Sequence, residues 1–378
     1  MGVNEPRFPL RPVCSLREEP CPVSLVAKNL TLLHNGEVFL DDISFTASPG
    51  ITVLVGPTLS GKTTLMRALA GLIKTDSGSV SVNGVDVGMT SVKDRSVSFV
   101  YQQFINYPSL SVFDNIASPL RVLKPKISKE EIDTRVHEVA AMLRITELLD
   151  RKPSALSGGQ QQRVAIARSL ARKSDVVLLD EPLANLDFKL REQLRDELQR
   201  IFADADMMVI YSTAEPLEAL DMASHTIVMN EGRVEQDGNA LDLYARPKNL
   251  PVAQAMSDPP LNLIASSVAT SNSESLGRVL ADKFGGTFTL GIRPHNIALQ
   301  SKDAADIGIN GKVRISEITG SSTYLHLDLE NAQKIVLEID GAQNFTSGST
   351  MTVFLDRSAV YGFDPKTGTT LFAPAAVR

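Results

Sequence analysis

The chain has 378 residues, enough for two domains with separate cores, and its 43% hydrophobic and 22% charged residues are typical of a globular protein. Its net charge of −6 at pH 7 argues against a dedicated nucleic-acid binder, which normally carries a basic face. No stretch approaches the roughly 18 consecutive apolar residues of a membrane-spanning helix, so we expect any membrane contact to come through partner proteins.

The first 22 residues differ in composition from the rest. They hold five prolines and scattered charges, without the apolar core of a secretory signal. Both cysteines of the chain, Cys14 and Cys21, lie there, and so few cysteines fit a reducing cytoplasm, where disulfides are rare. We expect residues 1–22 to form a flexible tail and the protein to be cytoplasmic.

The first predicted elements lead into a phosphate-binding loop. The residue pattern predicts strands over 24–33, 38–44 and 79–87, the last a hairpin that turns at Asn83-Gly84. A buried strand over 51–55 runs directly into a glycine-containing loop, and a helix follows over 62–71. The loop comprises Gly56, Pro57, Thr58, Leu59, Ser60, Gly61, Lys62, Thr63 and Thr64.

This order of strand, loop and helix favours a nucleotide site over a chance match in a glycine turn. The backbone N–H groups of such a loop converge on an anion, and the positive end of the following helix points to the same place. Lys62 supplies a positive charge to the outer phosphates, and the hydroxyl of Thr63 can ligate Mg²⁺.

Gln102 ends a predicted strand, just before a helical insert over about 105–170. A neutral amide at this place can reach both the magnesium ion and the attacking water, so we predict that Gln102 senses the γ-phosphate. An ordinary polar loop residue is the alternative. Within the insert, apolar residues at helical spacing predict an amphipathic helix through Ile132, Val136, Val139 and Leu143.

A second anion site is predicted in the run Leu156-Ser157-Gly158-Gly159-Gln160-Gln161-Gln162-Arg163. Ser157 and the N–H groups after it form a helix N-terminus, which can bind an anion, although a cap without a ligand is the alternative. Because the chain already has a complete phosphate loop, we expect this second site to face the nucleotide of another subunit. Two subunits packed head to tail would hold two nucleotides, and the residues acting in trans would be Ser157, Gly158, Gly159 and Gln160.

Two acids follow the apolar run Val176–Leu179. Asp180 can hold the magnesium shell, and Glu181 is the candidate to polarise the attacking water. Taken alone, the two acids would be better explained as solvated groups at a strand end, but they occur together with Lys62 and the run 156–163. The turn at 185–187 is expected to reach the partner subunit through Asp187, which is also a candidate helix N-cap.

The remaining pattern divides the chain into an α/β domain over 23–238 and a β-rich domain over 239–378. An amphipathic helix after Asp187, a strand over 207–213 and a hairpin that turns at 230–232 complete the first domain. From about residue 240 onward helical patterns fade. Alternating strands typical of a small β-barrel of the oligonucleotide-fold (OB) type are predicted over 287–290, 312–317, 323–329, 334–339 and 351–355.

These motifs, in this order, resemble the ATP-binding subunit of ABC (ATP-binding cassette) importers, and the resemblance covers the chain from about residue 23. Within that family the chain is most similar to the importers of maltose, other sugars and glycerol phosphate. Three regions carry this similarity: Tyr107-Pro108 with 111–116, 241–247 with 257–262, and Gly291-Ile292-Arg293-Pro294. Residues 319–329 and 362–365 are compatible with the regulatory β-domain that ends such subunits.

The resemblance implies ATP and Mg²⁺ as ligands and a dimer at the cytoplasmic face of the plasma membrane. That dimer would work with two transmembrane permease subunits, fed by an extracytoplasmic substrate-binding protein, and no nucleic acid is expected. The permeases of this family press a short helix into a groove near 102–115. The cargo would be a sugar, polyol, glycerol or glycerophosphate.

Three positions depart from the family pattern. Ala214 stands where the family has a histidine that contacts the γ-phosphate, and losing one such hydrogen-bond donor costs roughly 10²–10³ in rate. Leu59 replaces a glycine of the phosphate loop, where it is expected to crowd the approach to phosphate. His34 takes the place of the aromatic residue that stacks on adenine.

All three departures belong to the chain's own nucleotide site, whereas residues 156–163 match the family fully. We therefore expect pairing with a different, fully equipped ATPase. A homodimer with two slow sites and a largely non-catalytic regulatory subunit are the alternatives. A soluble ABC ATPase of translation or DNA repair would need tandem cassettes or a long coiled coil, and neither occurs in the sequence.

Overall fold

The computed structural model describes residues 23–184, 186–203, 207–222, 225–265, 287–303, 306–329 and 332–374. The predicted N-terminal tail and Asn185 lie outside the described residues. Contacts divide the chain into two compact units, Met1–Thr52 with Thr63–Tyr211 and Val53–Lys62 with Ser212–Arg378. The predicted boundary at 238/239 does not coincide with these divisions and stays a prediction.

A four-stranded antiparallel sheet begins the described chain, in the order β2-β1-β4-β5. Asn35 and Gly36, both at positive φ, turn β1 into β2, because this hairpin geometry needs residues that tolerate the left-handed region. Asn83 and Gly84 do the same between β4 and β5, as predicted. The strands are β1 (Leu25–His34), β2 (Glu37–Ala47), β4 (Ser77–Val82) and β5 (Val85–Asp86).

The second sheet has six strands in the order β10-β9-β3-β8-β7-β6. Its central strands are continuous apolar runs, and every residue of β7 and β8 is buried, as expected for strands covered on both faces. β6 and β7 pair in parallel. The strands are β3 (Gly50–Val55), β6 (Val97–Val100), β7 (Val176–Asp180), β8 (Met208–Thr213), β9 (His225–Asn230) and β10 (Arg233–Gly238).

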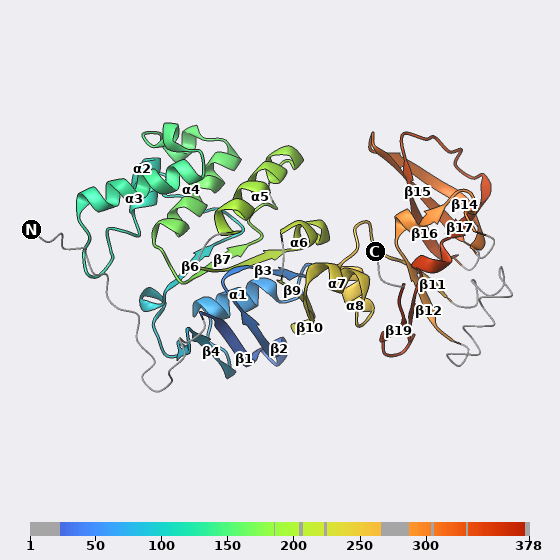
Figure 1. The fold of residues 1–378 in the computed structure, drawn as a ribbon, viewed down its shortest axis with the longest axis horizontal. Helices are drawn as coiled ribbons and strands as arrows, with labels where there is room; N and C mark the ends of the chain where they lie inside the picture. The colour runs from blue at the N-terminus through green and yellow to red at the C-terminus, as the bar shows by residue number, and fades with distance from the viewer. Residues whose placement is uncertain are drawn as a thin grey trace, which may run out of the picture. The chain divides into compact units, whose positions relative to one another are not determined.

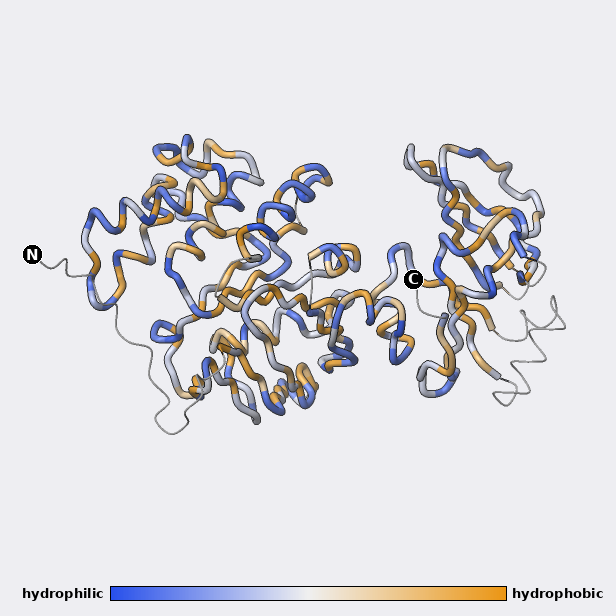
Figure 2. Tube along the Cα trace, in the orientation of Figure 1, coloured by the Kyte–Doolittle hydropathy of each residue, from blue (hydrophilic) through white to orange (hydrophobic). Residues whose placement is uncertain are grey.

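Helices accompany these strands in chain order. The tube of α5 alternates between hydrophilic and hydrophobic colours (Figure 2), and Leu194 and Leu198 on its inner face are fully buried, as its predicted amphipathic pattern requires. The helices are α1 (Lys62–Ala70), α5 (Phe188–Ala203) and α6 (Pro216–Met222).

The predicted helical insert consists of α2 (Val112–Ala117), α3 (Lys129–Met142) and α4 (Gly158–Ala171), which pack on one another (Figure 1). Ser128 starts α3 with a capping box, in which its hydroxyl accepts from the N–H of Glu131 and Glu131 accepts from the N–H of Ser128. Of the predicted apolar face, Val136, Val139 and Leu143 are fully buried and Ile132 is partly buried.

Helices do not fade at residue 240, contrary to the prediction. Two six-residue helices follow, α7 (Ala240–Ala245) and α8 (Leu250–Ala255), each started by an asparagine whose side chain accepts a backbone N–H. Such short helices show too little periodicity to be recognised in a sequence, and the Asn caps were the available signal. Short 3-10 turns cover Val92–Asp94, Thr146–Leu148, Pro153–Ala155, Pro294–Asn296 and Arg357–Ala359.

The C-terminal part contains two antiparallel sheets that share one apolar core (Figure 1). The near-barrel arrangement confirms the predicted OB-like β-rich domain. Strands β11 (Asn262–Ala265), β12 (Thr289–Ile292), β18 (Tyr361–Phe363) and β19 (Thr370–Phe372) form one sheet. The other, ordered β13-β17-β14-β15-β16, contains β13 (Ile297–Ala298), β14 (Ile307–Ile318), β15 (Ser322–Leu329), β16 (Lys334–Asp340) and β17 (Thr350–Leu355).

None of the helices in the described ranges has the length and apolarity that crossing a bilayer requires.

Candidate nucleotide site

The phosphate loop between β3 and α1 is folded back on its own lysine. Lys62 is only 4% exposed, and its Nζ donates to the carbonyl oxygens of Gly56 at 2.7 Å and Pro57 at 3.0 Å. The N–H of Ser60 donates to the Pro57 carbonyl at 3.2 Å. The buried positive charge of Lys62 therefore lies at the first residue of α1.

Backbone geometry explains the glycines of this loop. A Cβ at Gly56 would lie 2.2 Å from the carbonyl oxygen of Met229, and Gly61 has φ +100°. Leu59 has φ +69°, a left-handed conformation that costs an L-residue roughly 1–2 kcal/mol. The side chain of Leu59 is 95% exposed, and Thr58 beside it is also exposed.

The donors of the loop fit a phosphate chain. The hydroxyl of Ser60 is buried and has no hydrogen-bond partner among the described residues, so it is a polar group that a ligand can satisfy. Lys62 would hold the outer phosphates of bound ATP, and the bound nucleotide would supply the phosphoanhydride that is cleaved.

The hydroxyl of Thr63, the next residue, donates to Oδ1 of Asp180 at 3.0 Å, although 117 residues separate the two. Asp180 ends β7 and is 3% exposed. A hydroxyl and a carboxylate are hard oxygen ligands, the type that Mg²⁺ prefers. The two predicted metal ligands Thr63 and Asp180 thus lie together. Thr64, the next residue of α1 after Thr63, is half-buried.

Gln102 and Glu181, two further predicted site residues, are in direct contact. Nε2 of Gln102 donates to Oε2 of Glu181 at 2.9 Å. The pair forms because β6 and β7 are parallel neighbours, so the residues that follow them leave the sheet at the same edge. Glu181 has φ +43°, an uncommon conformation for a residue with a side chain. A carboxylate in this place can accept a proton from water, and the hydrogen bond from Gln102 orients the carboxylate.

The predicted trans-acting run starts α4 with a complete capping box. The hydroxyl of Ser157 accepts from the N–H of Gln160 at 3.4 Å, and Oε1 of Gln160 accepts from the N–H of Ser157 at 3.0 Å. The amide side chain of Gln160 is thus held within its own helix. The Ser157 hydroxyl keeps its hydrogen to donate, and the helix N-terminus offers N–H groups to an anion.

The two glycines of this run have different surroundings. A Cβ at Gly159 would lie 2.2 Å from Cδ2 of Leu190 on α5, whereas a Cβ at Gly158 would meet nothing within 4 Å. Arg163 fixes the far side of the helix, because its NH2 lies 3.3 Å from Oε2 of the buried Glu197 and its NH1 donates to the carbonyl of Leu143. Gly158 therefore faces open space on a firmly held helix.

Asp187 is exposed and caps α5, since its Oδ1 accepts from the N–H of Leu190 at 3.0 Å. The alternative role considered from the sequence, a helix N-cap, is confirmed. Its contact with a partner subunit stays a prediction.

Ala214 lines a cavity of about 660 Å³ together with Gly56 and Pro57 of the phosphate loop. The residue follows β8, and the N–H of Glu215 donates to the hydroxyl of Thr213 at 2.9 Å. Position 214 thus lies beside the loop, and its methyl group provides no hydrogen-bond donor there.

His34 lies exposed at the end of β1, and the structure adds a neighbour that the sequence reasoning missed. The ring of Phe39 packs edge to face against His34, with ring centroids 6.0 Å apart, and is 39% exposed. The hairpin turn at 35–36 brings the two rings together, and an exposed aromatic residue just after that turn was the available signal.

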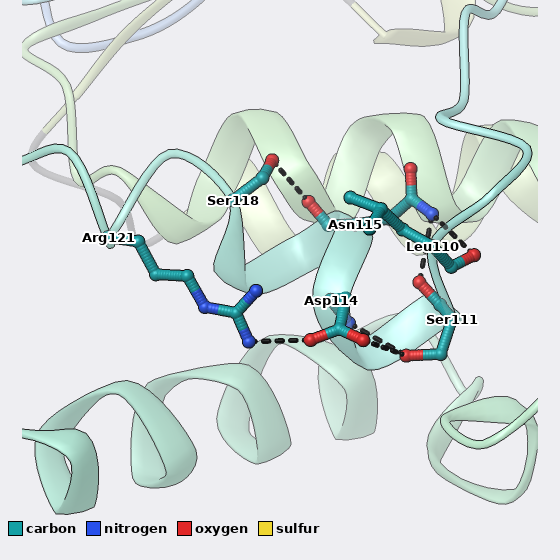
Figure 3. A network of polar contacts seen from close by, with 6 residues as sticks. All are labelled: Leu110, Ser111, Asp114, Asn115, Ser118 and Arg121. Carbon is teal, nitrogen blue, oxygen red and sulfur yellow. Dashed lines mark hydrogen bonds and ion pairs between the residues drawn. The ribbon is translucent and has the colours of Figure 1, made fainter.

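The helical region carries a separate groove of about 400 Å³, lined by Leu72, Val92, Tyr107, Val122 and Arg168, among others. Asn115 of α2 is fully buried and donates to the carbonyls of Leu110 and Ser111, as Figure 3 shows. Asn115 also bonds the N–H and carbonyl of Tyr107, which fixes this loop against α2.

The polar network continues at the start of α2 (Figure 3). Ser111 caps the helix by accepting from the N–H of Asp114, and Arg121 pairs with Asp114 at 2.5 Å. The hydrogen bond from Arg121 lowers the pKa of Asp114, with a further contribution from Ser111. Arg168 of α4 lies 4.9 Å from the ring centroid of Tyr107, so the groove wall is held from two helices.

Comparison with known proteins identifies the family of the chain. The ABC transporter family matches residues 40–184, and the TOBE domain family matches residues 290–363. The sn-glycerol-3-phosphate import ATP-binding protein UgpC 3 of Rhizobium etli is 38% identical over 317 residues, which cover 84% of this chain and 90% of the relative. The oligosaccharides import ATP-binding protein MsmX of Bacillus subtilis is 35% identical over 347 residues, covering 88% and 94%.

Solved structures of the ABC transporter cassette MJ0796 match the same fold. A dimeric structure of that cassette has a TM-score of 0.52 and 27% identity, covering 57% of this chain and 98% of the cassette. A post-hydrolysis structure bound to ADP and Pi has a TM-score of 0.51 at the same identity and coverage. The chain belongs to the ATP-binding proteins of ABC transporters and is an ATPase of that family.

Proposed function

We propose that this ABC ATPase drives an importer for a sugar, polyol, glycerol or glycerophosphate, as one half of an asymmetric ATPase dimer. The relatives named for glycerol-3-phosphate and oligosaccharide import support the cargo class. Work with membrane permeases and a substrate-binding protein is part of this proposal, and the names of the import relatives support a position at the cytoplasmic face of the membrane. The cargo is recognised by those partners, so the ATPase itself does not select it.

The asymmetry rests on one observation: the capped helix of 157–160 is complete, whereas position 214 beside the phosphate loop is alanine. The dimeric structure of the related cassette supports pairing with a second ATPase subunit. Gly158, with open space before it, would let the partner's nucleotide approach the helix N–H groups.

The chain's own residues keep most parts of a hydrolytic site. Lys62 would hold phosphate, Thr63, Gln102 and Asp180 would hold Mg²⁺, and Glu181 would take the proton of the attacking water. A histidine at 214 would donate to the γ-phosphate, so its absence lowers turnover by about 10²–10³-fold, or about 3–4 kcal/mol. ATP would therefore stay bound in this site longer than in the partner's.

The groove at Tyr107 is the proposed contact for a permease helix. Apolar side chains are exposed at its rim, and such exposed patches often mark protein–protein contacts. They are Leu72 at 41%, Val92 at 43%, Tyr107 at 47% and Val122 at 76% exposure. Tyr107 belongs to the segment predicted for this role.

A pull-down of the tagged chain from its native membrane tests the assembly. We expect permeases and a second, different ATPase in the captured complex. Recovery of this chain as the only ATPase would contradict the asymmetric dimer and favour a homodimer with two slow sites. ATP hydrolysis by the purified chain alone at the rate of an ordinary importer would contradict the impaired site.

A further inference from the structure

A second cavity of about 300 Å³ lies within the Val53–Lys62 and Ser212–Arg378 unit and takes no part in the proposed hydrolysis. Its polar lining consists of Tyr244, Asp258, Arg293, His295, Tyr324 and Glu338. Two further sequence regions that carried the family resemblance, 241–247 with 257–262 and 291–294, meet at this cavity. Its volume is at the lower end of the range for small-molecule sites.

Arg293 is the most unusual group in the lining. It is only 4% exposed, and its Cζ lies over aromatic rings, 3.5 Å from the ring centroid of Tyr244 and 5.0 Å from that of Tyr361. Its NH2 donates to the carbonyl of Tyr244 at 2.7 Å, and its NH1 donates to the hydroxyl of Tyr361. The Nε–H is buried and has no partner among the described residues. A buried donor without an acceptor is costly, so the hydrogen bonding of Arg293 is incomplete within the described residues.

Two carboxylates supply hydrogen-bond acceptors to the same cavity. Asp258 and Glu338 line the same cavity, and Tyr324 donates to Oε1 of Glu338 at 3.4 Å. Partial burial raises the pKa of Tyr324, and the neighbouring Glu338 raises it further, so the hydroxyl stays protonated near neutral pH. The lining thus combines a buried arginine, two carboxylate acceptors, His295 and tyrosine rings.

The charges of this lining largely offset one another. Two carboxylates disfavour an anion, and Arg293 cancels part of their attraction for a cation. Hydroxyl groups can accept from Arg293 and donate to Glu338 or Asp258 within one small molecule, while C–H faces pack on tyrosine. We propose that the cavity binds a small neutral polyhydroxylated ligand, a monosaccharide or a polyol.

The position of the cavity connects such a ligand to the nucleotide loop. Pro216 and Asp258 line this cavity and also the cavity that Ala214 shares with Gly56 and Pro57. A ligand that contacts these two residues changes the wall beside the loop. The binding site is argued from the cavity alone, whereas its use as a sensor of imported cargo rests on the proposed importer function.

Isothermal titration of the full chain without nucleotide tests the site separately from transport. The probes are a hexose, a hexitol and glycerol, with inorganic phosphate and glycerol phosphate as anionic comparisons. We expect saturable binding of at least one neutral probe, and any binding of the anions at the phosphate loop should be unaffected by Glu338→Gln. Glu338→Gln should weaken binding at least 10-fold, and Tyr324→Phe should weaken it less, because Tyr324 contributes through Glu338.

Glu317→Gln is the matched control, since it makes the same change at an exposed carboxylate of β14 outside the cavity, and it should leave binding unchanged. Thermal unfolding of each variant establishes that the fold is kept. The proposal is overturned if no neutral probe binds the wild type, or if Glu338→Gln binds the neutral probe as well as the wild type does. None of these results depends on whether the chain hydrolyses ATP.

Discussion

The phosphate loop and the start of α4 are both helix N-termini that can bind an anion, but they are built in opposite ways. The start of α4 satisfies itself, because Ser157 and Gln160 exchange hydrogen bonds and the backbone before the helix is extended. The loop before α1 instead contains left-handed residues, a buried ammonium and an unpartnered hydroxyl. The start of α4 is complete without a ligand, whereas the phosphate loop is stabilised by one. The three residues that we expect to depart from the family pattern, Leu59, His34 and Ala214, were all assigned to the site of the phosphate loop.

The largest effect should follow from a charge placed on the intact helix start. In Gly158→Asp the new carboxylate has free space and favours the helix N-terminus, so we expect stability to be kept. The same carboxylate repels the partner's phosphates and should lower ATP hydrolysis of the assembled transporter by about 10²–10³-fold. Phosphate release by the reconstituted complex is the measurement. Gly158→Ala is the control, and an unchanged rate in Gly158→Asp would remove the trans role.

Ala214→His should restore the weaker half. An imidazole at this position, beside Gly56 and Pro57, provides the missing donor and should raise turnover in the chain's own site by about 10²-fold. Single-turnover hydrolysis by the purified chain measures it. Ala214→Leu fills similar space without donating a hydrogen bond and should give no gain, so an equal gain in both variants would point to packing instead of catalysis.

Gly159→Ala tests whether Gly158 and Gly159 have different surroundings at the start of α4. Its methyl group would overlap Cδ2 of Leu190, and we expect a loss of about 1–3 kcal/mol in the free energy of unfolding. Chemical denaturation measures this loss. Leu190→Ala should remove the overlap. In the Leu190→Ala background, Gly159→Ala should therefore lower the free energy of unfolding less than it does in the wild type. Destabilisation of Gly158→Ala by the same amount would contradict the difference in surroundings.

Leu59→Gly should have the smallest effect. The substitution removes a left-handed leucine, worth roughly 1–2 kcal/mol, but gives the unfolded chain more freedom, worth about 0.4–1 kcal/mol. We expect a net stabilisation of about 1 kcal/mol or less, measured by thermal unfolding. A clear loss of stability would show that the exposed leucine makes a contact the fold requires.

The chemistry of the site could be predicted from the sequence further than its surroundings. Gln102 and Glu181, like Thr63 and Asp180, follow recognisable strands or motifs, and sheet topology then brings the members of each pair together. The motif residues carry their own chemical signal. The ion pair between Arg163 and Glu197 had no such signal, because it depends on how α4 packs on α5.

The cavity at Arg293 was also beyond the sequence. The run at 291–294 was recognised as a family mark, but its meeting with Tyr244 and Glu338 results from tertiary packing of β16 and α7. Likewise, α7 and α8 are six residues each and are held mainly by their caps and neighbours. Short elements take their stability from contacts that lie far away in sequence.

The wall formed by Pro216 and Asp258 belongs to both cavities of the second unit. If that wall couples them, thermodynamics makes the effect mutual: whatever factor a bound polyol imposes on nucleotide affinity, the nucleotide imposes on polyol affinity. The occupancy of each site would then depend on the concentrations of both the polyol and ATP. Uptake could be slowed when both are abundant, without any additional regulatory protein.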